Sequence, residues 1–363
     1  MVLAILVVIF SLSLLMALHE FGHFILAKKF GVKVEEFGIG MPPKIFGKKF
    51  GETIYSLNLI PFGAFVKIYG EENSKQSFDP QSFSAKPIWQ RALILLGGVI
   101  SFWLISMILF TFVLGLGAVT AVGDEDNPNF LNPKVQILGV VSDSPAKTAG
   151  IKAGDIILKL QFQEELLETN KVEEVRSFIR EHGKLPISLT IQRGREIFET
   201  NITPQITPSA KKAHLGIYLQ RTAIIKYSWS STPLEGIKTS FNTTKLALLG
   251  YFEIFKSIFK EKELPQGVEI MGPVGIGTFM VGAFEISFVY FLQILATISV
   301  FLAIFNLLPI PALDGGRLLF LGVEKIRGKP INREIEKNIN GVFFFLLMIL
   351  MIFVTTKDIM KLF

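Results

Sequence analysis

The stretch "MALHEFGHFI", residues 16–25, places two histidines and a glutamate inside an apolar segment that covers residues 1–27. An apolar run of about 18 residues or more predicts a transmembrane helix. Ionisable side chains are rare within such helices, and where they occur they mark functional sites. The stretch therefore predicts a membrane protein with a polar site in its first helix. A signal peptide is the alternative, but the run is long and no basic residue precedes it, which favours a retained helix.

The composition agrees with a membrane protein, because 50% of the residues are hydrophobic and the mean hydropathy is +0.48. Three further segments are expected to span the membrane, residues 92–122, 286–309 and 341–356. The glycine-rich segment 270–284 is expected to be interfacial or re-entrant. The chain has no cysteine, so catalysis or metal binding must use histidines, carboxylates or hydroxyls. Its net charge of +6 is expected from basic cytoplasmic loops, and no nucleic-acid partner is expected.

These segments predict a polytopic α-helical membrane protein with about four transmembrane helices and an inserted β-rich soluble domain. The expected blocks are a first part of the membrane core, the soluble domain, amphipathic interfacial helices and a second part of the core: residues 1–122, 123–225, 226–285 and 286–363. Lys and Arg outnumber Asp and Glu in segments 28–91 and 310–340, so both are expected in the cytoplasm. Both chain termini and the soluble domain are then expected outside it.

The polar residues of the opening stretch, His19, Glu20 and His23, form the pattern H-E-x-x-H. Residues i and i+4 lie on one face of a helix, so the two imidazoles can bind one zinc ion. Glu20 adjoins the first ligand and is suited to act as the base that activates water. The alternative is a pair of helix-packing histidines without a metal. The chain has only four histidines, however, and two of them are here.

A catalytic zinc site usually has three protein ligands and one open position, so a third ligand is expected elsewhere. The best candidate is Asp314, in the stretch NLLPIPALDGG at residues 306–316, at the expected end of the third span. His19 lies about 28 Å along a straight helix, near the expected cytoplasmic end of the first span. With four spans the third helix runs in the same direction, so Asp314 reaches the same depth. The alternative role of Asp314 is an ordinary turn residue before two glycines.

With these motifs the chain resembles the site-2 proteases, a family of intramembrane zinc metalloproteases, and especially their bacterial regulator-of-sigma-E branch. The resemblance is carried by HEFGH and by N-x-x-P-x-P-x-L-D-G, and it extends to FGIGMPPKIFG, GETIYSLNLIPFGAFVKIYGE and MGPVGIG. It implies three Zn2+ ligands, a catalytic base and a motif that holds the substrate or the oxyanion. These residues are His19, His23 and Asp314 for the metal, Glu20 for the base, and Asn306 with Pro309 for the substrate.

The chain departs from that branch in the second span, where a G-P-x-x-N-F element is usual and residues 98–102 read GVISF. No substrate contact is therefore expected there. Segment 51–69 alternates apolar and polar residues and is broken by Pro61, Phe62 and Gly63, which predicts strands that bend at a turn. In the family the equivalent piece is a membrane-associated β-loop, whose edge strand would pair with an unwound substrate. A plain cytoplasmic hairpin is the alternative.

Residues 135–160 carry S-P-A-x-x-A-G and then G-D between strand-like runs, and so resemble part of a PDZ domain. The stretch AHLGIYL, residues 213–219, resembles the carboxylate-binding loop of a circularly permuted PDZ domain. Backbone amides at Leu215, Gly216 and Ile217 would then bind a peptide C-terminus. A cap that excludes bulky substrates without binding a peptide is an equal alternative. Segment 233–262 is expected to be an interfacial helix or a simple connector.

The expected function is that of an intramembrane zinc endopeptidase in the lipid bilayer of a bacterial cytoplasmic membrane. Its expected substrates are single-span membrane proteins already trimmed outside, which in the family include anti-sigma factors and remnant signal peptides. A metal transporter would need polar residues along several helices, and the second and fourth spans have almost none. A catalytically inactive PDZ-containing scaffold is the other alternative, although it should have lost Glu20 or a metal ligand.

Overall fold

The computed structural model describes residues 1–71, 79–128, 130–141, 143–194, 196–206, 213–260 and 270–360 of the chain. The chain divides into two compact units, one made of Met1–Val113 and Ser230–Phe363 and the other of Leu114–Trp229. The first unit is therefore built from both ends of the chain, and the second unit is inserted between them.

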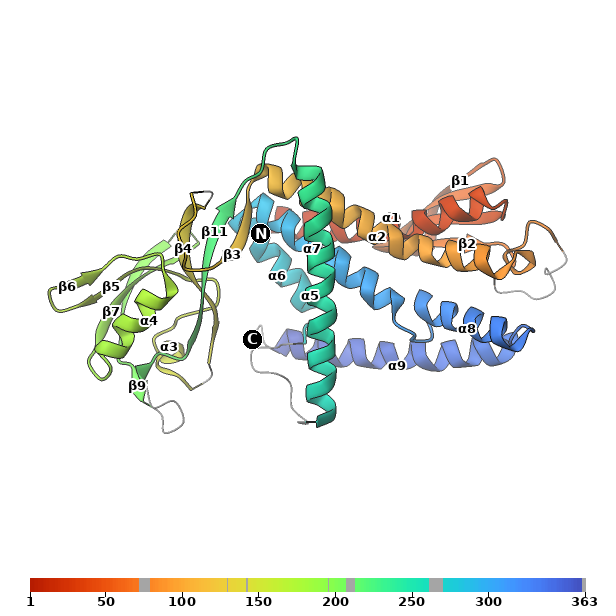
Figure 1. The fold of residues 1–363 in the computed structure, drawn as a ribbon. Coiled ribbons are helices and arrows are strands. Elements are labelled where there is room, and N and C mark those ends of the chain that lie inside the picture. Colours follow the sequence, from red (N-terminus) through yellow and green to blue (C-terminus); the bar gives the residue numbers. More distant parts are fainter. Residues whose placement is uncertain are drawn as a thin grey trace. The chain divides into compact units, whose positions relative to one another are not determined.

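The first unit contains the long helices and two long strands (Figure 1). Four described helices, namely α1, α2, α7 and α9, are long and apolar enough to cross a membrane, and this number agrees with the predicted number of spans. The elements of this unit are α1 (Val2–Lys29), β1 (Val34–Phe50), β2 (Thr53–Ile68), the 3-10 helix η2 (Phe83–Ala85), α2 (Ile88–Leu116), α5 (Thr232–Lys260), α6 (Pro273–Ile286), α7 (Phe288–Leu307), α8 (Asp314–Arg327) and α9 (Arg333–Met360).

The second span ends earlier than the sequence predicts. The expected segment was 92–122, whereas α2 ends at Leu116 and strand β3 (Ala118–Val122) follows. Gly117 has a φ of +116°, a conformation that ends the helix and that glycine adopts without strain. Most of the residues after it are β-branched, which favours a strand over a further helical turn.

Helix α8 occupies part of the segment that was predicted as a basic loop, residues 310–340. Asp314 is therefore the first residue of a separate helix, which was not predicted, and residues 308–313 join it to the end of the third span. α7 ends at Leu307 because the prolines at positions 309 and 311 cannot continue a helix. α8 begins with an acidic residue, has basic residues in its last turn and ends at a left-handed glycine, all of which favour a helix there.

Helices α1 and α7 begin at the same level. The amine of Met1 lies 3.4 Å from the carboxylate of Glu285, two residues before the cap of α7. α6 packs against both helices and buries Met280 completely. Its 14 residues span about 21 Å, less than the roughly 30 Å of a hydrocarbon core. α6 is thus shorter than a span, in keeping with the expectation for segment 270–284.

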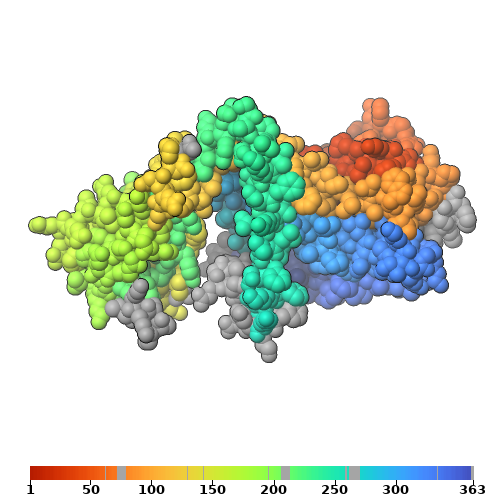
Figure 2. All heavy atoms as spheres, viewed as in Figure 1, coloured from red at the N-terminus to blue at the C-terminus, as the bar shows by residue number. Residues whose placement is uncertain are grey.

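Helix α5 lies across the outside of the other helices (Figures 1 and 2). Small or hydroxyl residues on one face, at Gly236, Ser240 and Thr244, allow it to approach α2 closely. The Ser240 hydroxyl is hydrogen-bonded to that of Ser106, and Trp103 donates its indole N–H to the hydroxyl of Thr244 at 3.1 Å. Large apolar side chains on the opposite face stay exposed, among them Leu246 and Phe252.

Strands β1 and β2 form a small sheet beside the second half of α1. Residues 36–39 of β1 each have two partners, one within residues 64–67 and one within residues 54–57 of β2. Because two partners of one residue lie on opposite sides of it, the two halves of β2 flank β1. The chain passes from one side to the other near Gly63, whose φ of +78° makes the predicted bend. No other described strand pairs with the segment 64–68, which is therefore an edge.

The second unit is β-rich, in agreement with the predicted soluble domain. Its main sheet has seven strands in the order β3-β11-β4-β5-β7-β8, with β6 paired to β5. Its core includes the fully buried Ile137, Leu160 and Leu189 together with Phe178 of α4. The elements after β3 are β4 (Leu131–Val140), α3 (Pro145–Thr148), β5 (Ile156–Phe162), β6 (Glu165–Leu167), α4 (Val172–Glu181), β7 (Ile187–Arg193), β8 (Glu196–Ile202), β9 (Gln205–Ile206), β10 (Ala213–His214) and β11 (Ile217–Ile225).

Candidate metal centre

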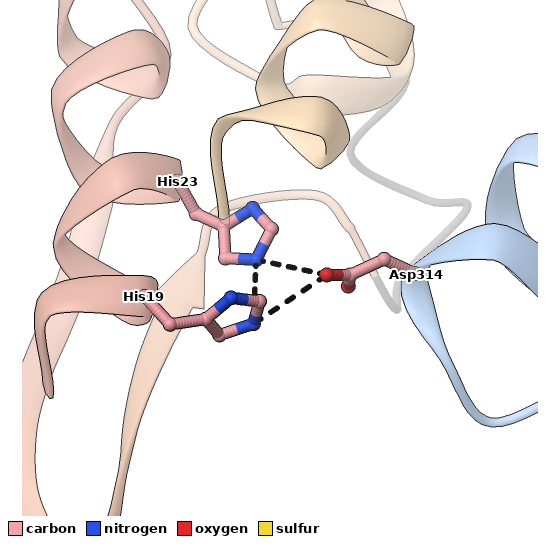
Figure 3. A group of neighbouring side chains, drawn as sticks. All are labelled: His19, His23 and Asp314. Atoms are coloured by element: carbon pink, nitrogen blue, oxygen red, sulfur yellow. Dashed lines mark hydrogen bonds and ion pairs between the residues drawn. The ribbon is translucent and has the colours of Figure 1, made fainter. Parts of the chain in front are cut away.

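The two histidines of H-E-x-x-H lie on one buried face of α1 (Figure 3). The side chains of His19 and His23 are one helical turn apart, because four residues separate them. Their Nε2 atoms lie 3.3 Å from each other. Both rings therefore present a nitrogen to the same point beside the helix.

Neighbouring groups on α2 fix the orientation of each ring. Nδ1 of His23 lies 2.9 Å from the carbonyl oxygen of Ile94. A carbonyl can only accept a hydrogen bond, so Nδ1 carries the proton and the lone pair of the neutral ring is on Nε2. The ring of His19 stacks on Phe102 with 4.4 Å between the centroids. The ring of His23 is thus held in the tautomer that offers Nε2 to a metal.

Asp314 completes a group of three candidate ligands. Its Oδ2 atom lies 3.4 Å from Nε2 of His19 and 3.3 Å from Nε2 of His23 (Figure 3). This buried oxygen makes no hydrogen bond to any residue that the structure describes. Three ligand atoms at roughly 2.0–2.1 Å from a tetrahedral zinc ion are about 3.3 Å from one another. The observed triangle of atoms therefore fits zinc, and the ion would supply the partner that the carboxylate oxygen lacks.

Glu20 lies beside this group and is held by a backbone amide. One of its carboxylate oxygens is 4.0 Å from Nε2 of His19. The other accepts a hydrogen bond from the N–H of Val66 at 3.1 Å. This N–H points out of the edge of β2, toward α1, and so contributes nothing to the pairing with β1. The strand edge thereby orients the carboxylate of the candidate base.

Two glycines of α2 allow that helix to pass close to the histidines. A Cβ atom at Gly98 would lie 2.3 Å from Cε1 of His19 and 2.4 Å from Nε2 of His23. A Cβ atom at Gly97 would lie 2.6 Å from the carbonyl oxygen of Gly22. Small residues at such crossings let helix backbones approach each other. No role was predicted for Gly98, because its sequence context does not indicate which helix it faces.

The candidate ligands open into a cavity of about 660 Å³. Asn306 lines this cavity, and its amide donates a hydrogen bond to the carbonyl of Leu302 at 2.9 Å. Arg317 and Glu71 form an ion pair in the cavity wall. The strand edge, residues 65–68, lines another part of the wall. The cavity thus brings together the candidate ligands, the candidate base, a side-chain amide and one edge of β2. The sequence offered no signal for the contribution of Arg317 and Glu71.

Of the residues predicted to bind the substrate, Pro61, Gly63 and Pro309 do not line the cavity. Pro61 and Gly63 lie at the bend of β2, where the carbonyl of Pro61 accepts a hydrogen bond from the hydroxyl of Ser13 at 2.5 Å. The side chain of Phe62 lies outside the described part of the chain. Pro309 is exposed in the turn between α7 and α8.

The predicted carboxylate-binding loop belongs to the second unit. Leu215 is buried, and its carbonyl accepts a hydrogen bond from the N–H of Ala146 at 3.0 Å. Gly216 has a φ of +75°, and its carbonyl accepts from Val141 at 2.8 Å. Ile217 begins β11. The loop is ordered by its backbone, and its role in binding a peptide stays a prediction.

A comparison with protein families identifies the family of this chain. The sequence model of Peptidase family M50 matches residues 7–350, which include H-E-x-x-H and Asp314. The chain belongs to this family. The predicted membership of the site-2 proteases, which are the M50 peptidases, and the predicted peptidase class are therefore confirmed.

Relatives along the whole chain agree with the M50 assignment. A Clostridium perfringens protein named "Putative zinc metalloprotease" is 36% identical over 360 residues, which cover 97% of this chain and 98% of that protein. The zinc metalloprotease RasP of Geobacillus kaustophilus is 28% identical over 429 residues, and the regulator of sigma-W protease RasP of Bacillus subtilis is 27% identical over 425. In both of these cases 95% of each chain is covered. Zinc, the predicted cofactor, is the metal in the names of the first two.

Proposed function

We propose that this protein is an intramembrane zinc endopeptidase that hydrolyses peptide bonds within the transmembrane segments of single-span membrane proteins. The observation that carries the proposal is the convergence of His19, His23 and Asp314, with Glu20 beside them, on an apolar helix long enough to span a bilayer. Such side chains are costly in hydrocarbon and are retained there for function. Membership of family M50 supports the peptidase activity.

His19, His23 and Asp314 would hold the metal. Bound zinc supplies a Lewis acid that polarises the scissile carbonyl and makes water more acidic. Glu20 takes a proton from the attacking water and delivers it to the leaving amine, so one carboxylate serves as base and then as acid. The hydrogen bond from Val66 keeps this carboxylate beside the ligands.

Asn306 is proposed to donate a hydrogen bond to the oxyanion or to the substrate backbone. It lines the same cavity as the ligands, and its side-chain oxygen can accept while its amide donates. Donors directed at a developing negative charge are among the strongest contributions to acyl-transfer catalysis. Pro309 is assigned a structural part, because it helps to end α7 between Asn306 and Asp314.

The edge of β2, residues 64–68, is proposed to bind the substrate as an added strand. A helix hides its carbonyls, so a transmembrane substrate must be unwound before hydrolysis. A strand edge offers backbone donors and acceptors to an extended chain, here those other than the N–H of Val66, which donates to Glu20. This edge lines the cavity and contacts Glu20 through Val66, so a paired substrate would run past the catalytic groups. Pro61, Phe62 and Gly63 would support this edge by making the bend before it.

The chain is proposed to lie in a bacterial cytoplasmic membrane with the catalytic groups near the cytoplasmic side. Its blocks follow each other in the predicted order, although the second unit begins at Leu114 and not at residue 123. This unit and both termini are proposed to lie outside the cytoplasm. The charge of segments 28–91 and 310–340 supports this orientation. The exposed apolar side chains of α5 support an interfacial helix on the membrane.

The substrates are proposed to be single-span proteins that another protease has already trimmed outside, such as anti-sigma factors and remnant signal peptides. The name of the Bacillus subtilis relative, a regulator of sigma-W protease, supports the first class. The second unit is proposed to be a PDZ-like domain that either binds the trimmed end at Leu215, Gly216 and Ile217 or excludes untrimmed proteins by size. Each of these actions would restrict the core to trimmed substrates.

The test is cleavage of a tagged single-span reporter in a host that lacks its own site-2 protease. We expect the wild-type protein to cleave the reporter and Glu20→Gln to lose at least about a hundredfold of that activity, as expected for a general base. Zinc content of both purified proteins should be equal, because Glu20 is not a proposed ligand. Equal cleavage by the two proteins would refute the enzymatic proposal and favour a scaffold.

A further inference from the structure

The turn that precedes Asp314 has few backbone donors of its own. Residues 308–313 connect α7 to α8 and include two prolines, which have no N–H. The N–H of Ile310 donates to the carbonyl of Leu308 at 2.7 Å, and that of Leu313 donates to the carbonyl of Ile310 at 3.1 Å. Both bonds stay within the turn, so they shape it without attaching it to another element.

Ala312 is the strained residue of this turn and also its attachment to another helix. Its φ of +78° lies in the left-handed region that residues with a Cβ atom rarely adopt. Its N–H donates to Oδ1 of Asn340, on α9, at 3.1 Å. This hydrogen bond crosses from one helix to a distant turn, and it opposes the relaxation of Ala312 to an ordinary conformation.

A rotation at Ala312 would displace the carboxylate that faces the histidines. Asp314 follows two residues later, and the first turn of α8 rests directly on the connecting residues. A Cβ atom at Gly315 would lie 2.1 Å from the carbonyl oxygen of Leu308, and one at Gly316 would lie 2.3 Å from that of Ile310. With so little free space, the first turn of α8 cannot absorb a change in the turn before it.

We propose that Asn340 is a positioning residue for Asp314. Its side-chain oxygen holds Ala312 in the left-handed conformation, and this conformation directs the Asp314 carboxylate toward His19 and His23. The inference rests on the proposed role of Asp314 as a zinc ligand. Residues that orient a ligand without touching the metal typically change metal affinity by about 10–100-fold when they are replaced.

The test measures the zinc affinity of the purified full-length protein by competition with a chelator. Asn340→Leu and Asn340→Ala remove the acceptor, and each should weaken zinc binding by about 10–100-fold. Asn340→Asp keeps an acceptor oxygen at the same distance and should bind zinc within about threefold of wild type, since Ala312 keeps its partner. Asn338→Leu is the matched control, because Asn338 is exposed on the same helix, and it should bind zinc as wild type does.

Asp314→Ala is the reference that separates this inference from the proposed function. If Asp314→Ala binds zinc as tightly as wild type, the proposed ligand set is wrong. If Asp314→Ala loses zinc while Asn340→Leu and Asn340→Ala both keep wild-type affinity, the role of Asn340 is refuted. An equal loss in Asn338→Leu would also refute it, because the effect would then belong to the helix. Thermal denaturation of each variant reports folding, and Asn340→Ala decides if the bulkier leucine prevents folding.

Discussion

The two halves of the candidate zinc site are built in different ways. His19 and His23 stand on a regular helix, and their separation follows from helix geometry whatever surrounds them. Asp314 follows an irregular turn whose shape depends on a strained Ala312 and on Asn340 of another helix. A chain can therefore encode part of a candidate metal site within five residues, while the rest depends on its tertiary structure.

The two halves should also fail for different reasons. Helix α2 packs directly against the helical half, so a larger side chain at this contact is expected to displace the histidines. The half that contains the turn has a strained residue held by a side chain, so loss of this hydrogen bond is expected to displace Asp314. Substitutions that add volume or remove a hydrogen bond near the site therefore test whether the two halves differ in this way.

The largest effect is expected for Gly98→Ala on α2. The new methyl group would lie 2.3–2.4 Å from atoms of both imidazoles, so at least one ring must move. We expect zinc affinity and reporter cleavage to fall by about a hundredfold or more, the typical result of a shift of about 1 Å in a catalytic site. Chelator competition and the reporter assay measure both. Gly277→Ala on α6, where a methyl group meets open space, is the control and should be neutral.

The next largest effect is expected for Val66→Pro, which should change turnover through the candidate base Glu20 and leave the candidate ligands in place. Val66→Pro removes the N–H that holds Glu20, and an outward position on an edge strand tolerates proline. A hydrogen bond to a charged group contributes about 1.5–3 kcal/mol, so turnover should fall by about 10–100-fold with zinc affinity unchanged. Val66→Ala keeps the N–H and should retain most of the activity. Wild-type turnover by Val66→Pro would show that Glu20 needs no support from the strand.

A smaller effect on the site is expected when α8 is loosened from α2. Arg91 forms a bidentate ion pair with Glu324, and both side chains are largely buried. Glu324→Gln leaves the guanidinium without its charged partner, which should lower the free energy of unfolding by about 3 kcal/mol. Thermal denaturation in detergent measures this loss, with the exposed Glu334→Gln as control. Zinc affinity should change by less than about threefold, because the turn before α8 keeps its own hydrogen bonds.

The smallest effect is expected for Ser101→Ala. The hydroxyl of Ser101 lies close to Gly22 and donates to the carbonyl of Gly97 in its own helix. Removing it adds no volume and leaves the backbone hydrogen bonds of α2 intact. Zinc affinity and cleavage should stay within about twofold of wild type. A large loss here, comparable to that of Gly98→Ala, would contradict the idea that this half depends on volume alone.

The parts of the site that could be predicted from the sequence have a fixed spacing or an unusual residue type. The pattern H-E-x-x-H predicts that its two histidines lie side by side, because residues i and i+4 share a helix face. Asp314 could be paired with it because four spans bring the ends of the first and third helices to one level. The four apolar helices and the β-rich domain were predictable from hydropathy and alternation.

The remaining features depend on tertiary contacts that leave little trace in the sequence. A backbone N–H such as that of Val66 is present at almost every residue, so nothing indicates that this one meets Glu20. Gly98 and Asn340 are ordinary residues until α2 and α9 are placed beside the ligands. Helix α8 was missed although its acidic start and the glycine after its end were visible, because its positive charge and the two prolines indicated a loop.

The order of the ligands along the chain has a consequence for the synthesis of the protein. On the proposed assignment, α1 with two ligands and the base is synthesised before the third ligand, which follows about 290 residues later. A growing chain therefore holds an incomplete zinc site beside other membrane proteins that are still being inserted. Hydrolysis must wait until α8 has been made, so the order of translation itself delays activity until the soluble domain and the first three spans have been synthesised.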